Sequence, residues 1–146
     1  MSKQLLDTDI LSEIIKGKHQ TVAARAAAYL QAERRFTTTA VTVAEVVYGF
    51  RRMGRADRID AFEASLSNVE VLPFDDAAAR IAGRINADLQ SQGYIIGMPD
   101  VMIAAIALHH GLTLATGNVA HFEYVRAIGF ELGIDNWRDS PTQAAR

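Results

Sequence analysis

The chain of 146 residues has a hydrophobic fraction of 49%, which is enough for one domain with a buried core. Charged residues make up 22% and cysteine is absent, so the composition excludes an intrinsically disordered chain, a disulfide framework, a thiol nucleophile and a Cys-ligated zinc site. Fifteen basic and 17 acidic side chains give a net charge of -2, so any attraction to nucleic acid must be local.

In chain order, short strands alternate with helices. The expected strands cover residues 3–6, 36–38, 69–72, 112–115 and 130–132, the last of them at an edge. The expected helices run from the Asp7–Asp9 cap to near Gly17, from Gln20 to Glu33, from Thr42 to a break near Gly54, from Asp57 to Ser67, from Asp75 to Gln92 and from Pro99 to His110.

This alternation predicts an α/β fold with a short, mainly parallel central sheet of about four to five strands, flanked by helices on both faces. We expect one domain over residues 1–138 and a disordered tail over 139–146. In parallel sheets the functional site lies at the carboxyl ends of the strands. Polar residues that directly follow a strand are therefore site candidates.

Membrane and export segments are not expected. The apolar run within Met1–Asp7 is too short for a signal peptide, and no uninterrupted apolar stretch approaches the ~20 residues of a membrane helix. We therefore expect a cytoplasmic protein without a membrane partner.

Two carboxylates stand in apolar surroundings. Glu45 is the only carboxylate or base in residues 40–50, AVTVAEVVYGF, and Asp100 is the only charged residue in 95–108, IIGMPDVMIAAIAL. A carboxylate among such residues is costly unless water, a partner or a cation compensates it. For Asp100, and for Asp7 after the first strand, capping of a helix N-terminus is an equally good explanation.

The three acids together point to a metal site. On the predicted fold, Asp7, Glu45 and Asp100 lie at the same edge of the sheet, where they would repel one another unless a divalent cation neutralises them. Oxygen ligands select Mg²⁺ or Mn²⁺. Such ions activate water for attack on phosphodiesters.

Four segments carry a family resemblance: LLDTDIL, TVAEVVYGF, MPDVMIAAIAL and LATGNVAHFEYV. In this order and spacing, from Leu5 to Trp137, the chain resembles the PIN-domain ribonucleases, and more narrowly the VapC toxins of bacterial toxin–antitoxin pairs. The resemblance implies a PIN-like α/β/α sandwich.

The resemblance also implies site residues. The acidic triad of the family maps onto Asp7, Glu45 and Asp100, and its fourth position, often Asp, is Asn118 here. As a neutral oxygen donor, Asn118 would hold a second metal only weakly. Residues that support the ligands are then Thr116, Thr8 and Asp9.

The implied activity is Mg²⁺- or Mn²⁺-dependent endonucleolytic cleavage of RNA by a metal-activated water, without a histidine general base. The family further implies a homodimer, inhibition by a VapB-like antitoxin, and repression of the operon by the complex. His19 and His121 show no ligand spacing, and the end of a helix is sufficient reason for His109 and His110.

RNA contacts are expected from basic side chains near Glu45. The densest basic segment holds Arg51, Arg52, Arg55 and Arg58, and Arg34 with Arg35 is a second candidate. A solvated helix face explains any one of them equally well.

Two other functions compete with the ribonuclease. Asn118 in place of an acid suits a catalytically weak PIN-like protein that acts mainly in antitoxin binding and operon repression. A phosphatase or receiver-like domain would explain Asp7 but neither Glu45 nor Asp100.

Overall fold

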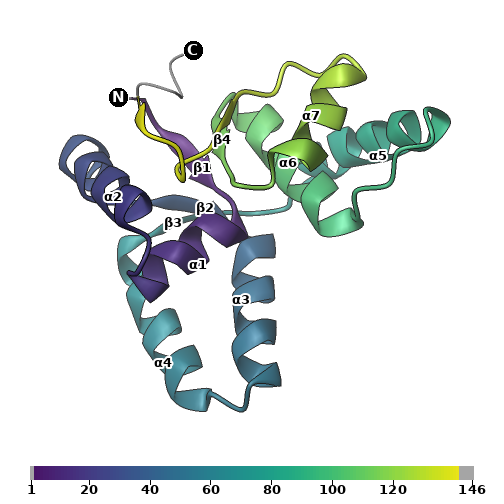
Figure 1. Ribbon diagram of the computed structural model, residues 1–146. Coiled ribbons are helices and arrows are strands. Elements are labelled where there is room, and N and C mark those ends of the chain that lie inside the picture. Colours follow the sequence, from purple (N-terminus) through teal and green to yellow (C-terminus); the bar gives the residue numbers. More distant parts are fainter. Residues whose placement is uncertain (1, 142–146) are drawn as a thin grey trace.

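The structure, a computed structural model, describes residues 2–141 and contains short strands alternating with helices (Figure 1). The strands are β1 (Gln4–Leu6), β2 (Thr37–Thr39), β3 (Glu70–Leu72), β4 (Thr113–Ala115) and β5 (Ile134–Asp135). The helices are α1 (Thr8–Lys16), α2 (Gln20–Glu33), α3 (Ala40–Arg52), α4 (Ala56–Ser65), α5 (Asp76–Ser91), α6 (Met98–His110) and α7 (Val119–Ala127), and a turn of 3-10 helix covers Leu66–Asn68. In this part of the chain no helix is both long and apolar enough to cross a membrane.

All strand pairs are parallel, as predicted, but the sheet is in two pieces. One piece has the order β1-β4-β5 and the other pairs β2 with β3. The Thr38 hydroxyl donates to the Leu6 carbonyl at 2.8 Å, so a side chain links the two pieces where β1 and β2 run side by side.

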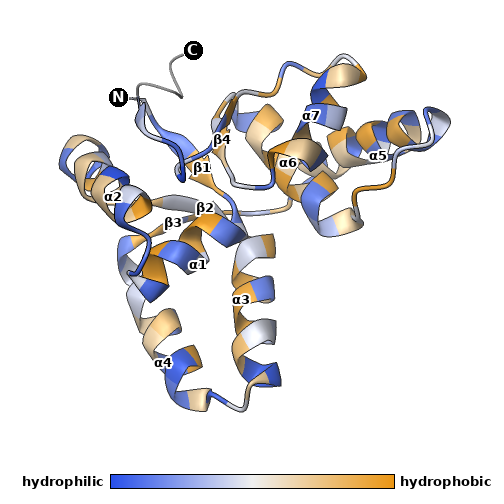
Figure 2. Cartoon of the chain, in the orientation of Figure 1, coloured by the Kyte–Doolittle hydropathy of each residue, from blue (hydrophilic) through white to orange (hydrophobic). Residues whose placement is uncertain are grey.

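β1 is buried on both faces, and this defines the layers of the sandwich. Leu5 packs into a cluster with residues of α5, α6 and α7, whereas Leu6 packs into a second cluster with residues of α1 and α2. Successive side chains of a strand point to opposite faces, so one strand contributes to both clusters. Figure 2 shows that α6 is predominantly hydrophobic, in keeping with the burial of its central residues, among them Val101 and residues 103–107.

The last strand and the last helix differ from the prediction. The strand lies at Ile134–Asp135 rather than at 130–132, and α7 was not predicted. Leu132 is buried but only precedes the pairing, which begins where the Leu114 amide donates to the Gly133 carbonyl at 2.8 Å. The position of β5 is thus set by its partner β4 rather than by its own hydrophobic pattern.

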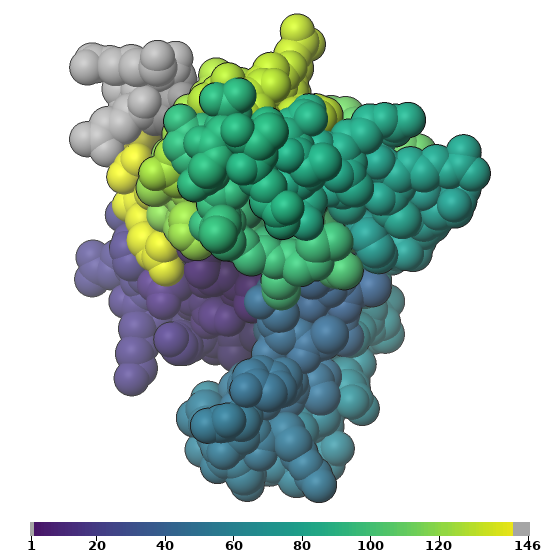
Figure 3. Space-filling view, turned by 90° about the vertical axis from the view of Figure 1, so that its right-hand side faces the viewer, coloured from purple at the N-terminus to yellow at the C-terminus, as the bar shows by residue number. Residues whose placement is uncertain are grey.

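A hairpin formed by α3 and α4 projects from the rest of the molecule (Figures 1 and 3). Phe62 is buried at its base, in the cluster that also contains Val46. This hairpin carries Glu45 and the basic segment from Arg51 to Arg58.

Candidate active site

Asp7 lies at the carboxyl end of β1, against the end of β4. Its amide donates to the Ala115 carbonyl at 2.9 Å, which continues the strand pairing for one residue. Its Oδ1 accepts from the Thr8 amide at 2.8 Å, and its Oδ2 accepts from the Thr116 hydroxyl at 2.7 Å. Asp7 is therefore the N-cap of α1 and also part of a polar network at the sheet edge.

The electrostatic environment of Asp7 disfavours its charge. Burial, followed by the charge of Asp9 and with a further contribution from Asp100, raises the pKa of Asp7 to about 7, although hydrogen bonds from Thr116 and the Thr8 amide act in the opposite direction. A carboxylate so placed is strongly stabilised by any nearby cation.

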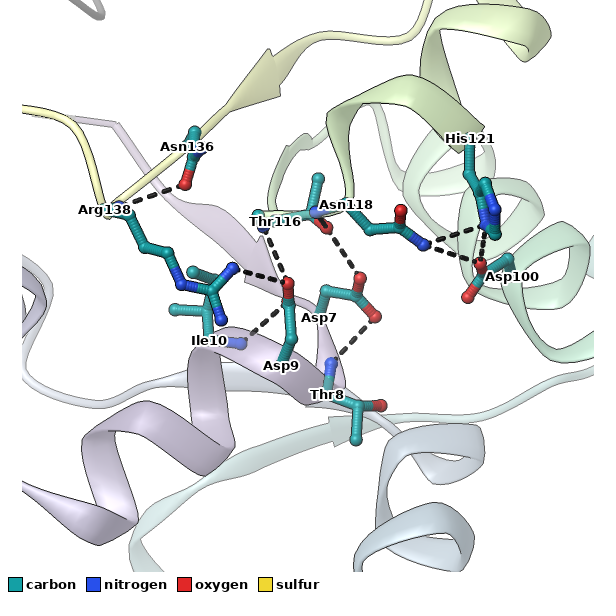
Figure 4. A network of polar contacts seen from close by, with 11 residues as sticks. Asp7, Thr8, Asp9, Ile10, Asp100, Thr116, Asn118, His121, Asn136 and Arg138 are labelled. Carbon is teal, nitrogen blue, oxygen red and sulfur yellow. Dashed lines mark hydrogen bonds and ion pairs between the residues drawn. The ribbon is translucent and has the colours of Figure 1, made fainter. Parts of the chain in front are cut away.

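Asp100 lies in the first turn of α6, but its side chain does not cap the helix. The N-cap is Gly97, with φ of 89°, and α6 has no side-chain cap hydrogen bond. Instead, Asp100 Oδ2 lies 2.8 Å from His121 Nδ1 and accepts from Asn118 Nδ2 at 3.2 Å (Figure 4). Capping therefore does not account for Asp100.

Thr116 and Asn118 connect the two aspartates. The Thr116 hydroxyl donates to Asp7 and accepts from the backbone amide of Asn118 at 3.0 Å. The side-chain amide of Asn118 in turn donates to Asp100. Four of the predicted site residues, Asp7, Asp100, Thr116 and Asn118, thus share one network.

Asp9 faces the turn between β4 and α7. Its Oδ2 accepts from the Gly117 amide at 2.9 Å and from Arg138 Nη1 at 3.3 Å. Arg138 lies so close over Gly117 that a Cβ there would be 1.6 Å from Nη1. Asp9 therefore fastens α1 to this turn.

Glu45 lies at the side of this network. Its Oε1 accepts from the Thr8 hydroxyl at 2.6 Å, and Thr8 Oγ1 lies 3.1 Å from Thr42 Oγ1. Glu45 also lines a cavity of about 230 Å³ between α1 and the α3–α4 hairpin, whose other walls include Ile15, Val46 and Phe50.

The donor set fits a hard cation, although the three predicted ligands are not gathered around one point. Within residues 2–141 no three Asp, Glu or His side chains lie close enough together to hold a metal ion. Carboxylate oxygens nevertheless dominate the site, and the charges of Asp9 and Asp100 oppose ionisation of Asp7. A divalent ion with oxygen ligands would reverse that effect.

Two site residues were missed from the sequence. His121 touches both Asp100 and Asn118, and Arg138 pairs with Asp9 (Figure 4). His121 follows Asn118 by three residues at the start of α7, so a predicted helix there would have placed the two side chains together. For Arg138 no local signal exists, because its partner is 129 residues away.

The predicted RNA-binding arginines lie on the projecting hairpin. Arg51 and Arg52 are exposed in the last turn of α3, Arg55 pairs with Asp57 at 2.8 Å, and Arg58 lines the cavity beside Glu45. In the second candidate pair, Arg34 is the exposed C-cap of α2, and Arg35 pairs with Glu70 at 3.2 Å.

Among known protein families, the PIN domain matches residues 5–127 of this chain. Among curated proteins, the ribonuclease VapC2 of Haemophilus influenzae is 34% identical over 94% of this chain and 99% of its own length. The tRNA(fMet)-specific endonuclease VapC of Shigella flexneri is 34% identical over 90% of this chain and 98% of its own length.

Solved structures of toxin–antitoxin complexes have the same fold. The chain superposes on one from the DNA-bound VapBC complex of Salmonella typhimurium with a TM-score of 0.79 and 32% identity, covering 94% of this chain and 99% of the other. For VapBC-1 of nontypeable Haemophilus influenzae the TM-score is 0.78 and the identity 27%, covering 94% of this chain and 100% of the other.

Proposed function

Since this chain belongs to the PIN-domain family, within its VapC branch, we propose that it is a Mg²⁺- or Mn²⁺-dependent endoribonuclease and the toxin of a toxin–antitoxin pair. The observation that carries the proposal is the buried Asp7 at the carboxyl end of β1, joined through Thr116 and Asn118 to Asp100. A metal ion would compensate the negative charge concentrated there.

Asp7, Glu45 and Asp100 would hold the ion, with Asn118 as a further oxygen donor. When bound, the ion supplies an activated water and positive charge for the leaving oxygen. The protein itself orients the ligands: Thr116 and the Thr8 amide fix Asp7, and the Thr8 hydroxyl fixes Glu45. The burial of Asp7 keeps bulk water from competing with these contacts.

RNA would approach along the side of the α3–α4 hairpin. Arg58 shares a cavity with Glu45, and Arg51, Arg52 and Arg55 continue from it toward the tip of the hairpin. Guanidinium groups bind phosphates through paired donors, and they would offset the repulsion between RNA and the acidic site.

A VapB-like antitoxin would be the protein partner. The related structures are of complexes between toxin and antitoxin, and the Salmonella typhimurium complex is bound to DNA. We therefore infer that this chain forms a homodimer, binds its antitoxin and represses its operon in that complex.

Cleavage of RNA by the purified protein tests the proposed enzyme. We expect strand cleavage with Mg²⁺ or Mn²⁺, loss of cleavage in EDTA, and a loss of about 100-fold or more in Asp100→Asn, because one ligand of the ion is removed. Glu131→Gln, an exposed surface change, serves as the control and should cleave like the wild type. Cleavage that persists in EDTA would exclude the mechanism.

A second candidate is a catalytically weak protein that acts mainly through antitoxin binding and repression. It is favoured by Asn118, which presents its Nδ2 to Asp100 rather than adding a fourth carboxylate. Wild-type protein that forms the antitoxin complex but binds no Mn²⁺ and cleaves no RNA would favour this candidate.

A further inference from the structure

His121 lies in the active site although neither charge nor spacing indicated it. Its Nδ1 is 2.8 Å from Asp100 Oδ2 and 2.8 Å from Asn118 Nδ2. Figure 4 shows the three side chains facing one another at the corners of a triangle. The side chain of His121 is 42% exposed and that of Asp100 is 20% exposed, so the contact lies at the rim of the site.

Two anchored helices bring His121 to Asp100. Phe122 and Val125 are completely buried and fix α7 against the core, and α7 starts directly after Asn118. Asp100 is held in the first turn of α6, the most buried helix of the chain. The contact is therefore a product of core packing, not of two mobile surface side chains.

The location of the imidazole proton decides what His121 does. One ring nitrogen carrying one proton cannot both donate to Asp100 and accept from Asn118. With the proton on Nδ1, Asp100 Oδ2 accepts a charge-assisted hydrogen bond from the ring and a second hydrogen bond from Asn118 Nδ2, so Asn118 donates to the carboxylate and not to the ring. With the proton on Nε2, a lone pair of Nδ1 would face that carboxylate oxygen at 2.8 Å. The carboxylate therefore favours the Nδ1–H tautomer.

We propose that His121 is a positioning residue, whose Nδ1–H holds Asp100 Oδ2 and leaves Oδ1 for the metal ion. This inference rests on the proposed metal-dependent function. A ligand carboxylate that is itself hydrogen-bonded keeps its orientation, and loss of such a support lowers metal affinity or activity by about 10- to 100-fold.

Three substitutions separate the two ring nitrogens. His121→Phe keeps the ring shape and removes both nitrogens. His121→Asn returns an amide nitrogen near the place of Nδ1, whereas His121→Gln returns one near the place of Nε2. His110→Phe, at the exposed end of the helix that carries Asp100, is the matched control.

Calorimetric titration with Mn²⁺ gives the readout that does not depend on cleavage. We expect Kd to rise about 10- to 100-fold in His121→Phe, to return to within about threefold of the wild type in His121→Asn, and to remain high in His121→Gln. At saturating Mn²⁺, kcat should follow the same order while KM for RNA stays constant. Rescue by Gln instead of Asn, or wild-type affinity in His121→Phe, would overturn the proposal.

A measurement of the His121 tautomer distinguishes failure of this inference from failure of the proposed function. In metal-free wild-type protein, nitrogen–proton correlation NMR should show the proton of His121 on Nδ1, and Asp100→Ala should release that preference. A wild type that binds no Mn²⁺ and cleaves no RNA would overturn the proposed enzyme, and with it the metal-directed part of this inference. A proton found on Nε2 would overturn the positioning contact, whatever the enzyme does.

Discussion

Asp7 is buried between the ends of two parallel strands, with two other acids nearby. Its contacts with Thr116 and the Thr8 amide stabilise the charged form, yet burial and the neighbouring charges outweigh them. At the residue scale, the negative charge concentrated at this site therefore lowers the free energy of unfolding of the metal-free protein.

The first prediction concerns the stability of the metal-free protein. Because the pKa of Asp7 is raised from 3.8 to about 7, the unfolded chain releases this proton earlier than the folded chain as pH rises. The free energy of unfolding should fall between about pH 4 and pH 7, by up to about 4 kcal/mol, and then level off.

Denaturant unfolding in EDTA, of the wild type and Asp7→Asn at several pH values, measures this effect. The variant cannot ionise at position 7, so its stability relative to the wild type should increase across the window. Acids that do not interact with Asp7 contribute equally to both proteins and cancel in the difference, whereas Asp9 and Asp100 are part of the measured effect. If the difference in free energy of unfolding between the two proteins is independent of pH, the raised pKa of Asp7 is contradicted.

A second prediction concerns Asn118. Asn118→Asp replaces a donor that lies 3.2 Å from Asp100 Oδ2 with another carboxylate. We expect about 1–3 kcal/mol lower stability without metal and a lower Kd for Mn²⁺, because the ion neutralises the added charge.

Asn118→Ala is the control, because it removes the hydrogen bond without adding charge. It should lose stability without any gain in Mn²⁺ affinity. Equal Mn²⁺ affinity in the two variants would show that position 118 does not face the ion.

The residues of the site were predictable to different extents. Asp7 and Asp100 were visible because each is a charge next to a buried apolar run, and the structure joins them through one network. Glu45 was visible for the same reason, and it reaches the network only through Thr8, whose hydroxyl donates to Glu45 and whose amide donates to Asp7. His121 depends on the contact between two helices, which residue spacing alone does not encode.

At the scale of elements, the C-terminal strand is held by side chains more than by its own two residues. Arg25 of α2 binds Asp135 of β5 at 2.6 Å, with both side chains largely buried. Asp135 also accepts from Gln4 at 3.0 Å, and Gln4 accepts from Trp137 at 2.8 Å. Long-range contacts therefore fix where β5 forms.

The third prediction follows from this contact. Asp135→Ala leaves the guanidinium of Arg25 buried without its carboxylate, and we expect it to lower the free energy of unfolding by about 3–5 kcal/mol. Glu123→Ala removes an exposed partner of Arg126 and should change it by less than about 1 kcal/mol. Denaturant unfolding compares the two variants, and similar losses in both would contradict the importance assigned to the Arg25–Asp135 ion pair.

The pairing of the backbone with β4 explains why the predicted last strand was misplaced. The pattern at 130–132 is apolar and alternating, but the backbone that pairs with β4 comes later, where Gly133 lies close to Thr113. The other strands were predicted to within about one residue, and two of them, β1 and β3, end just before a recognisable helix start, at Asp7 and at Asp75. β5 has no such boundary.

At the scale of the whole molecule, the net charge of -2 no longer argues against RNA. Three of the acids that produce it belong to the proposed metal site, while the arginines lie on a projecting hairpin (Figure 3). Arg51 and Arg52, in the last turn of α3, are thus set apart from Asp7 and Asp100 at the sheet edge, and attraction to RNA can arise at that end of the hairpin.

The fourth prediction tests that separation. Replacing both Arg51 and Arg52 with Gln should raise KM for RNA several-fold with little change in kcat, because these side chains lie at the far end of α3 from the sheet. Each lost phosphate contact should also reduce the salt dependence of RNA binding, by about 0.7 in the log–log slope for a single strand.

Arg80→Gln, an exposed change on α5, is the control and should leave both KM and the slope unchanged. If Arg80→Gln changed KM and the slope as much as the Arg51 and Arg52 replacements do, RNA binding would depend on the net charge of the protein alone.

The most direct test of the account is a calorimetric titration of the purified protein with Mn²⁺, comparing the wild type with Asp7→Asn. We predict saturable binding to the wild type and none detectable for the variant, with both proteins folded by circular dichroism. Unchanged binding in Asp7→Asn, or no binding to the wild type, would contradict the claim that Asp7, after β1, and Asp100, in the first turn of α6, form a metal site.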